Sequence, residues 1–150
     1  MIQFEVLGKV KGKGRPRFVR RGKYVKTYTD DETATYENLI RLSFIQSGCK
    51  PYDNEAQLKA VVKIYITPSK SVSKKKLAEM FEGKIRPTKK PDIDNILKSL
   101  FDGLNKVAYQ DDTQIIAVEC EKFYGDTERL EVVIYDIWEE KLWQMNYMRS

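Results

Sequence analysis

The sequence contains no histidine, and this single absence excludes several kinds of chemistry. A catalytic triad built on histidine, a Cys-His pair, zinc held by imidazole and histidine-based acid–base catalysis are all unavailable within the chain. Any reaction catalysed by this chain must therefore rely on carboxylates, lysines and a metal ion.

Cysteine and long apolar runs are scarce as well. The two cysteines, Cys49 and Cys120, lie far apart without a Cys-x-x-Cys spacing, so we expect reduced, partly buried thiols rather than a zinc knuckle or a disulfide framework. No apolar run approaches the roughly 20 residues that cross a bilayer, and the N-terminus lacks the apolar core of a signal peptide. We therefore expect no membrane partner and a cytoplasmic location.

Charged residues, in contrast, are abundant and unevenly distributed. The chain has 27 Lys and Arg against 22 Asp and Glu, a net charge of +5, and the basic residues gather in a few segments. This asymmetry favours a polyanionic partner, most simply nucleic acid, although a solvated basic surface explains net charge alone equally well. The length of 150 residues suits one domain.

Apolar periodicity predicts a single compact α/β domain with a mixed β-sheet packed against helices. The domain is expected over residues 1–137, with a short C-terminal helix or tail over residues 138–150. Expected strands cover residues 2–8, 58–68, 113–125 and 129–138, and expected helices cover residues 30–48, 71–83 and 95–107. The last two strands are expected to pair as an antiparallel hairpin with Gly125 at its turn.

A strongly basic segment, KVKGKGRPRFVRRGKYVKTYT, covers residues 9–29 and predicts a loop or irregular hairpin, because glycine and proline interrupt it. Its lysines and arginines are candidates to contact DNA phosphates, as are two lysines further along the chain. The candidates are Lys11, Lys13, Arg15, Arg17, Arg20, Arg21, Lys23, Lys89 and Lys90. In the alternative interpretation, some of these arginines pair with Asp30, Asp31 and Glu32 at the start of the first helix.

The stretch KKPDIDNILKSLFDGLNKVAYQDD, residues 89–112, places a pair of carboxylates at each end of one short helix. Asp92 and Asp94 follow a proline in an extended segment, where residues two apart point to the same side. A single aspartate there is most simply a helix cap, but a second one gains nothing from capping and is repelled unless a cation compensates. If Asp111 and Asp112 return to the same place, the carboxylates suit Mg²⁺ or Mn²⁺, which prefer oxygen ligands.

Lys98 follows Asp94 by four residues and precedes Asp102 by four, so the three side chains share one side of the helix. They form either a surface ion-pair ladder or a functional group in which Lys98 neutralises charge on a phosphate held beside the carboxylates. We favour the second interpretation because the lysine is adjacent to the carboxylates. Carboxylates, a lysine, no histidine and basic flanks together favour metal-assisted hydrolysis of a phosphodiester by a metal-bound water.

The stretch PTKKPDIDNILKSLFDGLNKVAYQDDTQI resembles the RusA family of Holliday junction resolvases, and so does GKVKGKGRPRF followed by TYTDDETATYE. The resemblance covers most of residues 2–135, and the family is frequent in phages and prophages. It implies a homodimer of mixed α/β subunits that binds four-way DNA junctions and nicks two strands symmetrically with Mg²⁺. Asp92, Asp94 and Asp112 match the family's catalytic, metal-binding aspartates, Asp111 matches the adjacent motif position, and Lys98 matches its essential lysine.

Two other functions agree with the same residues. One is a less selective metal-dependent nuclease that acts on flaps or replication forks. The other is a structure-specific DNA-binding protein whose aspartates only cap a helix. The presence of Lys98 beside both acidic pairs argues against the second.

Overall fold

The computed structural model describes residues 1–15, 17–28 and 31–149. The strands are β1 (Ile2–Leu7), β2 (Arg17–Arg21), β3 (Tyr24–Tyr28), β4 (Leu58–Ile66), β5 (Ile115–Tyr124) and β6 (Arg129–Asp136). The helices are α1 (Asp31–Ser47), α2 (Lys74–Phe81), α3 (Ile93–Leu104) and α4 (Ile137–Arg149), with a short 3-10 helix, η1 (Asp112–Gln114), before β5.

The strands and helices predicted from the sequence exist, with shifted ends. The basic segment contains a two-stranded hairpin, β2–β3, and the C-terminal residues form a helix rather than a tail. Helix α2 starts later than predicted because Ser73 caps it, its hydroxyl accepting a hydrogen bond from the Lys76 backbone N–H. Helix α3 stops at Leu104, where Asn105 returns to extended backbone. Asp30, the predicted start of the first helix, lies outside the described residues.

The main sheet is mixed, as predicted, and has the strand order β1-β6-β4-β5. Strand β6 pairs antiparallel with both β1 and β4, whereas β4 and β5 are parallel. The predicted hairpin between the last two strands is therefore wrong, because β4 lies between β5 and β6. The prediction assumed that strands joined by a short turn are neighbours, which is common but not general.

The turn that joins β5 to β6 crosses the end of β4. The Gly125 backbone N–H donates a hydrogen bond to the Ile66 carbonyl oxygen at 3.0 Å. A Cβ atom at position 125 would lie 3.0 Å from Cδ1 of Tyr65, so only glycine lets the backbone pass this close to the ring. Gly125 is at the turn, as predicted, but its role is to carry the chain over a third strand.

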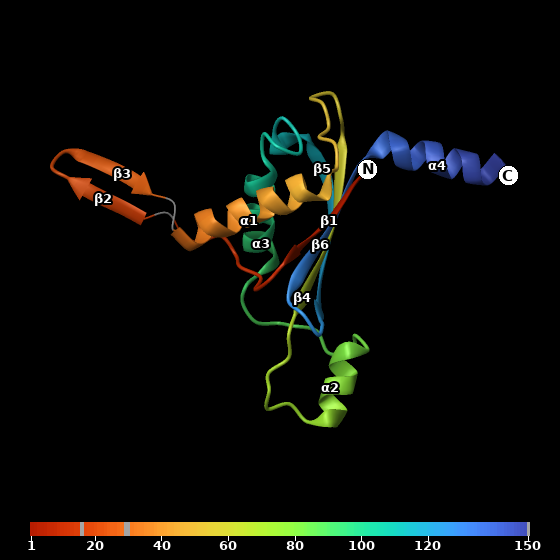
Figure 1. Ribbon diagram of the computed structural model, residues 1–150, viewed down its shortest axis with the longest axis horizontal. Coiled ribbons are helices and arrows are strands. Elements are labelled where there is room, and N and C mark those ends of the chain that lie inside the picture. Colours follow the sequence, from red (N-terminus) through yellow and green to blue (C-terminus); the bar gives the residue numbers. More distant parts are fainter. Residues whose placement is uncertain (16, 29–30, 150) are drawn as a thin grey trace.

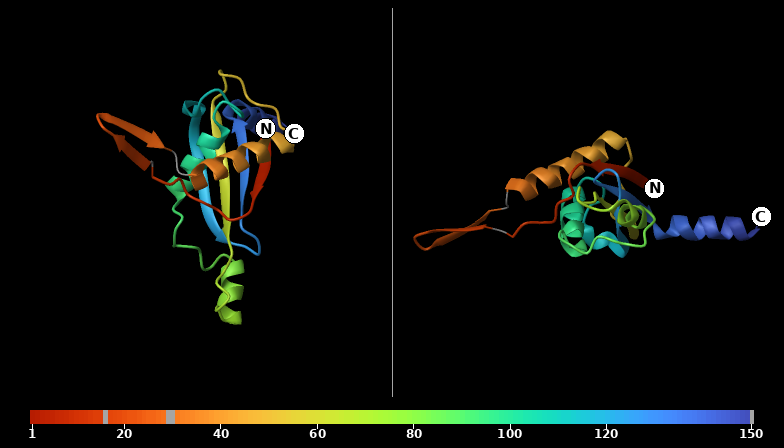
Figure 2. Two further views of the ribbon diagram at one scale, coloured as in Figure 1. Left: turned by 60° about the vertical axis from the view of Figure 1, so that its left-hand side comes forward. Right: turned by 90° about the horizontal axis from the view of Figure 1, so that it is seen from below.

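Helices α1 and α3 cover one face of the main sheet (Figure 2). Alternate residues of β4 are buried beneath them, which is the period expected of a strand with one covered face. Helix α3 contributes Ile96, Leu100 and Leu104, all fully buried and spaced four residues apart. Burying an aliphatic side chain of this size stabilises the fold by roughly 1.5–3 kcal/mol.

Helices α1 and α3 also pack closely against each other. A Cβ atom at Gly103 of α3 would lie 2.9 Å from the Glu37 backbone oxygen of α1, so a larger residue would push the helices apart. The buried face of α1 consists of Thr33, Tyr36, Ile40 and Phe44. Leu39 lies outside this face and is 38% exposed.

In the part of the chain that the structure describes, no helix lies across the opposite face of the sheet (Figure 1). One end of this face carries a continuous stack in which two arginines enclose two aromatic rings. The Arg129 guanidinium lies 3.9 Å from the Tyr65 ring centroid, and the Tyr65 and Phe123 rings stack at 5.6 Å. The Arg86 guanidinium lies 3.9 Å from the Phe123 ring centroid and completes the stack. These contacts tie three strands together at one end of the sheet.

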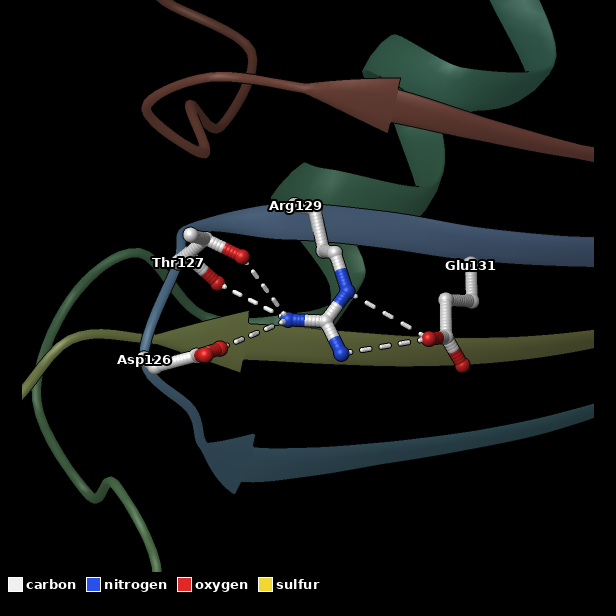
Figure 3. Close-up of polar contacts among 4 residues, drawn as sticks. All are labelled: Asp126, Thr127, Arg129 and Glu131. Carbon is white, nitrogen blue, oxygen red and sulfur yellow. Dashed lines mark hydrogen bonds and ion pairs between the residues drawn. The ribbon is translucent and has the colours of Figure 1, made fainter.

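Arg129 is held in this position by polar contacts with three residues, Asp126, Thr127 and Glu131 (Figure 3). Its Nη1 donates to the Thr127 carbonyl oxygen at 3.1 Å and lies 3.8 Å from a carboxylate oxygen of Asp126. Its Nε and Nη2 both contact Oε1 of Glu131, at 3.3 and 3.2 Å. The β5–β6 turn is therefore fixed to the end of the sheet.

Two segments project from this body in opposite directions: the β2–β3 hairpin and helix α4 (Figure 1). We call the hairpin, residues 17–28, the β2–β3 arm. No helix among the described residues is long and apolar enough to cross a membrane. Cys49 and Cys120 are free and partly buried, as predicted.

Candidate active site

The first carboxylate pair lies at the start of α3. Asp92 occupies the N-cap position with extended backbone, but its side chain makes no capping hydrogen bond to the helix. Its carboxylate instead accepts a hydrogen bond from Nδ2 of Asn95 at 2.8 Å. Contact with the neighbouring Asp94 carboxyl, and then this hydrogen bond, hold the pKa of Asp92 below its ordinary value. Capping therefore does not account for this pair, and both carboxylates remain available to a ligand.

Lys98 is one helical turn beyond Asp94, and the two side chains are loosely paired. The distance from Nζ of Lys98 to the Asp94 carboxylate is 4.0 Å, and the side chains are 62% and 69% exposed. An ion pair this open contributes little to stability. Asp102, the third member of the predicted ladder, is bound by Lys13. Lys98 is therefore placed to meet an anion that approaches Asp94 from solvent.

The second carboxylate pair, Asp111 and Asp112, lies at η1, immediately before β5. The Thr113 hydroxyl donates to Asp111 at 2.9 Å, and this hydrogen bond is the main cause that lowers the pKa of Asp111. Partial burial, followed by contact with Asp111 and the negative charge of Asp102, raises the pKa of Asp112. The pair therefore carries its negative charge unevenly.

The four aspartates form two separate pairs. Across residues 1–15, 17–28 and 31–149, no three Asp, Glu, His or Cys side chains are grouped as a metal site. The convergence of Asp92, Asp94, Asp111 and Asp112 around one ion therefore stays a prediction. The donor chemistry nevertheless fits Mg²⁺ or Mn²⁺, because each pair offers only carboxylate oxygens and is partly or fully open to solvent.

The first part of the basic segment packs directly against the start of α3. The Lys13 backbone N–H donates to the Asn95 carbonyl oxygen at 3.0 Å. A Cβ atom at Gly12 would lie 3.0 Å from Cβ of Asn95 and 3.3 Å from Cβ of Pro91. The Gly14 backbone N–H donates to the Thr33 hydroxyl of α1 at 2.8 Å. The basic segment thus begins beside Asp92 and Asp94 and leads outward into the β2–β3 arm.

Lys13 was predicted to contact DNA, but its charge is already matched within the chain. Its ammonium group binds the Asp102 carboxylate and lies 3.4 Å from Oε1 of Glu37. The hydrogen bond to Asp102 is the main cause that raises the pKa of Lys13. We therefore reassign Lys13 to holding the basic segment between α1 and α3.

The other basic candidates differ in position and in exposure to solvent. Arg15 and three residues of the β2–β3 arm, Arg20, Arg21 and Lys23, are exposed, whereas Lys11, at the base of the segment, is partly buried. Lys89 and Lys90 are exposed just before the first carboxylate pair. Arg17 lies in β2, but its side chain is outside the described residues. The alternative pairing of these arginines with the start of α1 stays untested for the arm.

Sequence reasoning missed the residues that hold the two pairs in place. Nζ of Lys122 donates to the carbonyl oxygens of Lys89 and Pro91, at 2.6 and 2.9 Å, and so fixes the segment before Asp92. Oε1 of Gln114 accepts from the backbone N–H groups of residues 110 and 111, while its Nε2 donates to the Asp53 and Ala56 carbonyl oxygens. The Asp-x-x-Gln spacing is typical of a capping box and would have identified Gln114. Nothing local in the sequence identifies Lys122.

The sequence is similar to those of known proteins. The sequence model of the family described as endodeoxyribonuclease RusA matches residues 8–135. The chain is 36% identical over 149 residues to the uncharacterised protein YqaN of Bacillus subtilis (strain 168), a match that covers 91% of this chain and 96% of that protein. It is also 37% identical over 51 residues to the crossover junction endodeoxyribonuclease rusA of Lactococcus phage r1t, covering 33% of this chain and 39% of that protein.

The family match covers most of the chain, including both carboxylate pairs and the β2–β3 arm. The chain therefore belongs to the RusA endodeoxyribonuclease family, and the resemblance noted in the sequence is confirmed. Helix α4 begins at Ile137, beyond the matched residues.

Proposed function

We propose that this protein is a Mg²⁺-dependent endodeoxyribonuclease that resolves four-way DNA junctions as a homodimer, by paired symmetric nicks. Family membership supports the reaction class. The observation that carries the proposal is the position of the basic segment, which packs against the start of α3. Beside it lie an exposed lysine and two carboxylates that are not used to cap the helix. A phosphodiester guided along this segment arrives at Asp94 and Lys98.

Asp92, Asp94, Asp111 and Asp112 are the residues that would hold Mg²⁺ or Mn²⁺. The bound ion would orient and acidify the water that attacks phosphorus in line, leaving a 5′-phosphate and a 3′-hydroxyl. Lys98 supplies a positive charge on the exposed side of α3, where it neutralises phosphate oxygens as the P–O bond breaks. Asn95 and Thr113 orient one carboxylate of each pair through the hydrogen bonds that they donate.

DNA binding rests on the exposed cations of the β2–β3 arm and on Lys89 and Lys90. Contacts of this kind recognise the phosphate backbone rather than the bases. Selection of a junction therefore depends on the shape of the branched DNA and on the spacing of two subunits. We place the action of the protein on DNA in the cytoplasm.

The proposal is tested by cleavage of three labelled substrates: a synthetic four-way junction, a flap and a plain duplex. Each is incubated with and without Mg²⁺, and the Asp94→Asn variant serves as the control for contaminating nuclease. We expect Mg²⁺-dependent nicks at symmetric positions of the junction alone. Equal cleavage of the flap would identify a less selective branched-DNA nuclease, and binding without cleavage would identify a non-catalytic DNA-binding protein.

A further inference from the structure

The chain between α2 and the first carboxylate pair, residues 86–91, runs beside strand β5 without joining the sheet. Its sequence, RPTKKP, contains two prolines, which have no backbone N–H to donate. Among the described residues, none of these six makes a hydrogen bond from backbone to backbone. Side chains must therefore hold this segment, which we call the 86–91 linker.

Two cationic side chains join the linker to β5, one from each side. Nη1 of Arg86 donates to the Lys122 carbonyl oxygen at 2.8 Å, and Nη2 donates to the Glu121 carboxylate at 3.0 Å. In return, Nζ of Lys122 donates to the carbonyl oxygens of Lys89 and Pro91, at 2.6 and 2.9 Å. Strand β5 lies at the edge of the main sheet, where one row of backbone groups is available for such contacts.

The two cations differ in what they bind. The Arg86 guanidinium has a carboxylate partner and also lies 3.9 Å from the Phe123 ring centroid. The Lys122 ammonium, within the part of the chain that the structure describes, contacts carbonyl oxygens of the linker alone. Its contacts therefore determine where the linker backbone lies, rather than balancing a negative charge.

The linker ends at Pro91, and Asp92 follows it directly. Pro91 is held from two sides, because Lys122 binds its carbonyl oxygen and a Cβ atom at Gly12 would lie 3.3 Å from its Cβ. The Asp92 carboxylate accepts a hydrogen bond from Asn95 but does not cap α3. The backbone that enters the helix therefore also determines where this carboxylate lies.

Asp92 and Asp94 have to be held close together before a cation arrives. Their carboxyl groups contact each other, and like charges at such a distance repel one another. A metal site of this kind depends on a surrounding structure that keeps its ligands in position. Removing a side chain that orients metal ligands typically weakens metal binding by roughly 10- to 100-fold.

We infer that Lys122 is a positioning residue: by holding the 86–91 linker on β5, it sets the affinity of the Asp92–Asp94 pair for a divalent cation. Lys122 acts through the backbone of Pro91 and Asp92 and does not itself bind the ion. The inference rests on the proposed function for the identity of this pair as metal ligands.

The inference is tested by Mn²⁺ binding to the full chain without DNA, with the free ion measured by electron paramagnetic resonance. Lys122→Met keeps the aliphatic stem and the carbonyl oxygen that Arg86 binds, but loses the ammonium. It should raise the Mn²⁺ Kd by roughly tenfold or more. Lys122→Arg again offers donors to two carbonyl oxygens and should recover most of the affinity. Loss of binding in Asp94→Asn identifies the Mn²⁺ held at this pair.

Arg129→Met is the matched control. Arg129 also fixes a connecting segment to the end of the main sheet, and its polar contacts are with Asp126, Thr127 and Glu131 rather than with the linker (Figure 3). Both variants should lower the Tm, but only Lys122→Met should change the Mn²⁺ Kd. Hydrogen exchange of the amides of residues 88–90 and 92–94 should become faster in Lys122→Met and stay unchanged in Arg129→Met.

An unchanged Mn²⁺ Kd in Lys122→Met, an equal change in Arg129→Met, or unchanged exchange of the linker amides would each overturn the inference. A wild-type chain that binds no Mn²⁺ would overturn the inference and the metal assignment together. Mn²⁺ binding that depends on Lys122 as described, in a chain that leaves four-way junctions intact, would refute the proposed function and leave the role of Lys122 standing.

Discussion

The β2–β3 arm and helix α4 both leave the body of the protein, and both expose apolar side chains, yet they differ in charge. The arm exposes Phe18, Tyr24 and Val25 at 70%, 83% and 62%, values close to those of Trp143 and Met148 on α4. Residues 17–28 contain five lysines and arginines and no acidic residue, whereas α4 has two of each sign. Apolar exposure alone does not separate the two segments, but net charge does.

This difference indicates which of the two segments contacts DNA. A concentrated positive charge attracts phosphates at long range, and a two-stranded ribbon is narrow enough to enter the major groove of DNA. A neutral helix has no excess positive charge to attract a polyanion. The comparison therefore predicts that chemistry and DNA affinity can be lost separately, by changes in two different places.

The largest effect is expected at the first carboxylate pair, which belongs to neither projecting segment. Asp94→Asn removes a proposed metal ligand without changing volume and should reduce junction cleavage by roughly a thousandfold or more, because bound metal supplies several kcal/mol of catalysis. Junction affinity should be unchanged or higher, since a negative charge facing phosphate is lost. Gel-shift and cleavage assays on the same junction measure both. Near wild-type cleavage by the purified variant would refute the metal assignment.

A smaller loss of cleavage is expected for Lys98→Ala. Removing a charge aimed at a developing oxyanion costs about 3–4 kcal/mol, a factor of roughly 10²–10³ in rate. Loss of an exposed ion pair alone would cost under about 1 kcal/mol of stability and leave the rate intact. Turnover and Tm of the same variant distinguish the two roles. Lys75→Ala, at an exposed lysine of α2, is the control and should change neither.

The difference between the arm and α4 is tested by removing the same number of positive charges from each of them. Arg20→Gln with Arg21→Gln on the arm should lower the slope of log affinity against log salt by about 1.8, because each lost phosphate contact contributes roughly 0.9. Lys141→Gln with Arg149→Gln on α4 removes the same charge and should leave the slope unchanged. DNA binding is measured by fluorescence anisotropy between low and physiological salt. Equal slopes for the two double variants would show that the arm has no special role on DNA.

The sequence predicts the helices and strands, but not which of them lie side by side in the fold. Short-range patterns determine the helices and strands, so spacing alone places one carboxylate pair at the start of α3 and the other just before β5. The insertion of β4 between β5 and β6 depends on contacts between strands far apart in the chain, and a short turn gives no signal of it. The tie between Lys122 and the Lys89–Pro91 segment depends on the same long-range placement.

The sequence also cannot show which lysines of the basic segment are paired within the fold. From sequence, Lys13 and Lys23 are equivalent members of one basic segment. In the structure, Lys13 is bound by acidic residues of two helices, whereas Lys23 is exposed at the end of the arm. Charge patterning identifies a basic segment, but only packing shows which of its charges are already matched.

The smallest expected effect separates these two lysines. Lys13→Met keeps the aliphatic stem but leaves Asp102 and Glu37 without their cation, and should lower stability by about 1 kcal/mol, a fall of roughly 2–4 °C in Tm. The salt slope of DNA binding should not move. Lys23→Met should do the reverse, leaving Tm unchanged and lowering the slope by about 0.9.

The pH dependence of stability gives Lys13 a second signature. Because the folded protein raises the pKa of Lys13 above 10.5, its contribution is fully present below that pH and is lost as pH rises through the higher pKa of the folded state. The difference in stability between wild type and Lys13→Met should therefore be constant near neutral pH and shrink in strong alkali, as measured by urea unfolding. A Lys13→Met variant with unchanged Tm and a lower salt slope would show that Lys13 contacts DNA phosphates. The base of the basic segment and the arm would then have the same role.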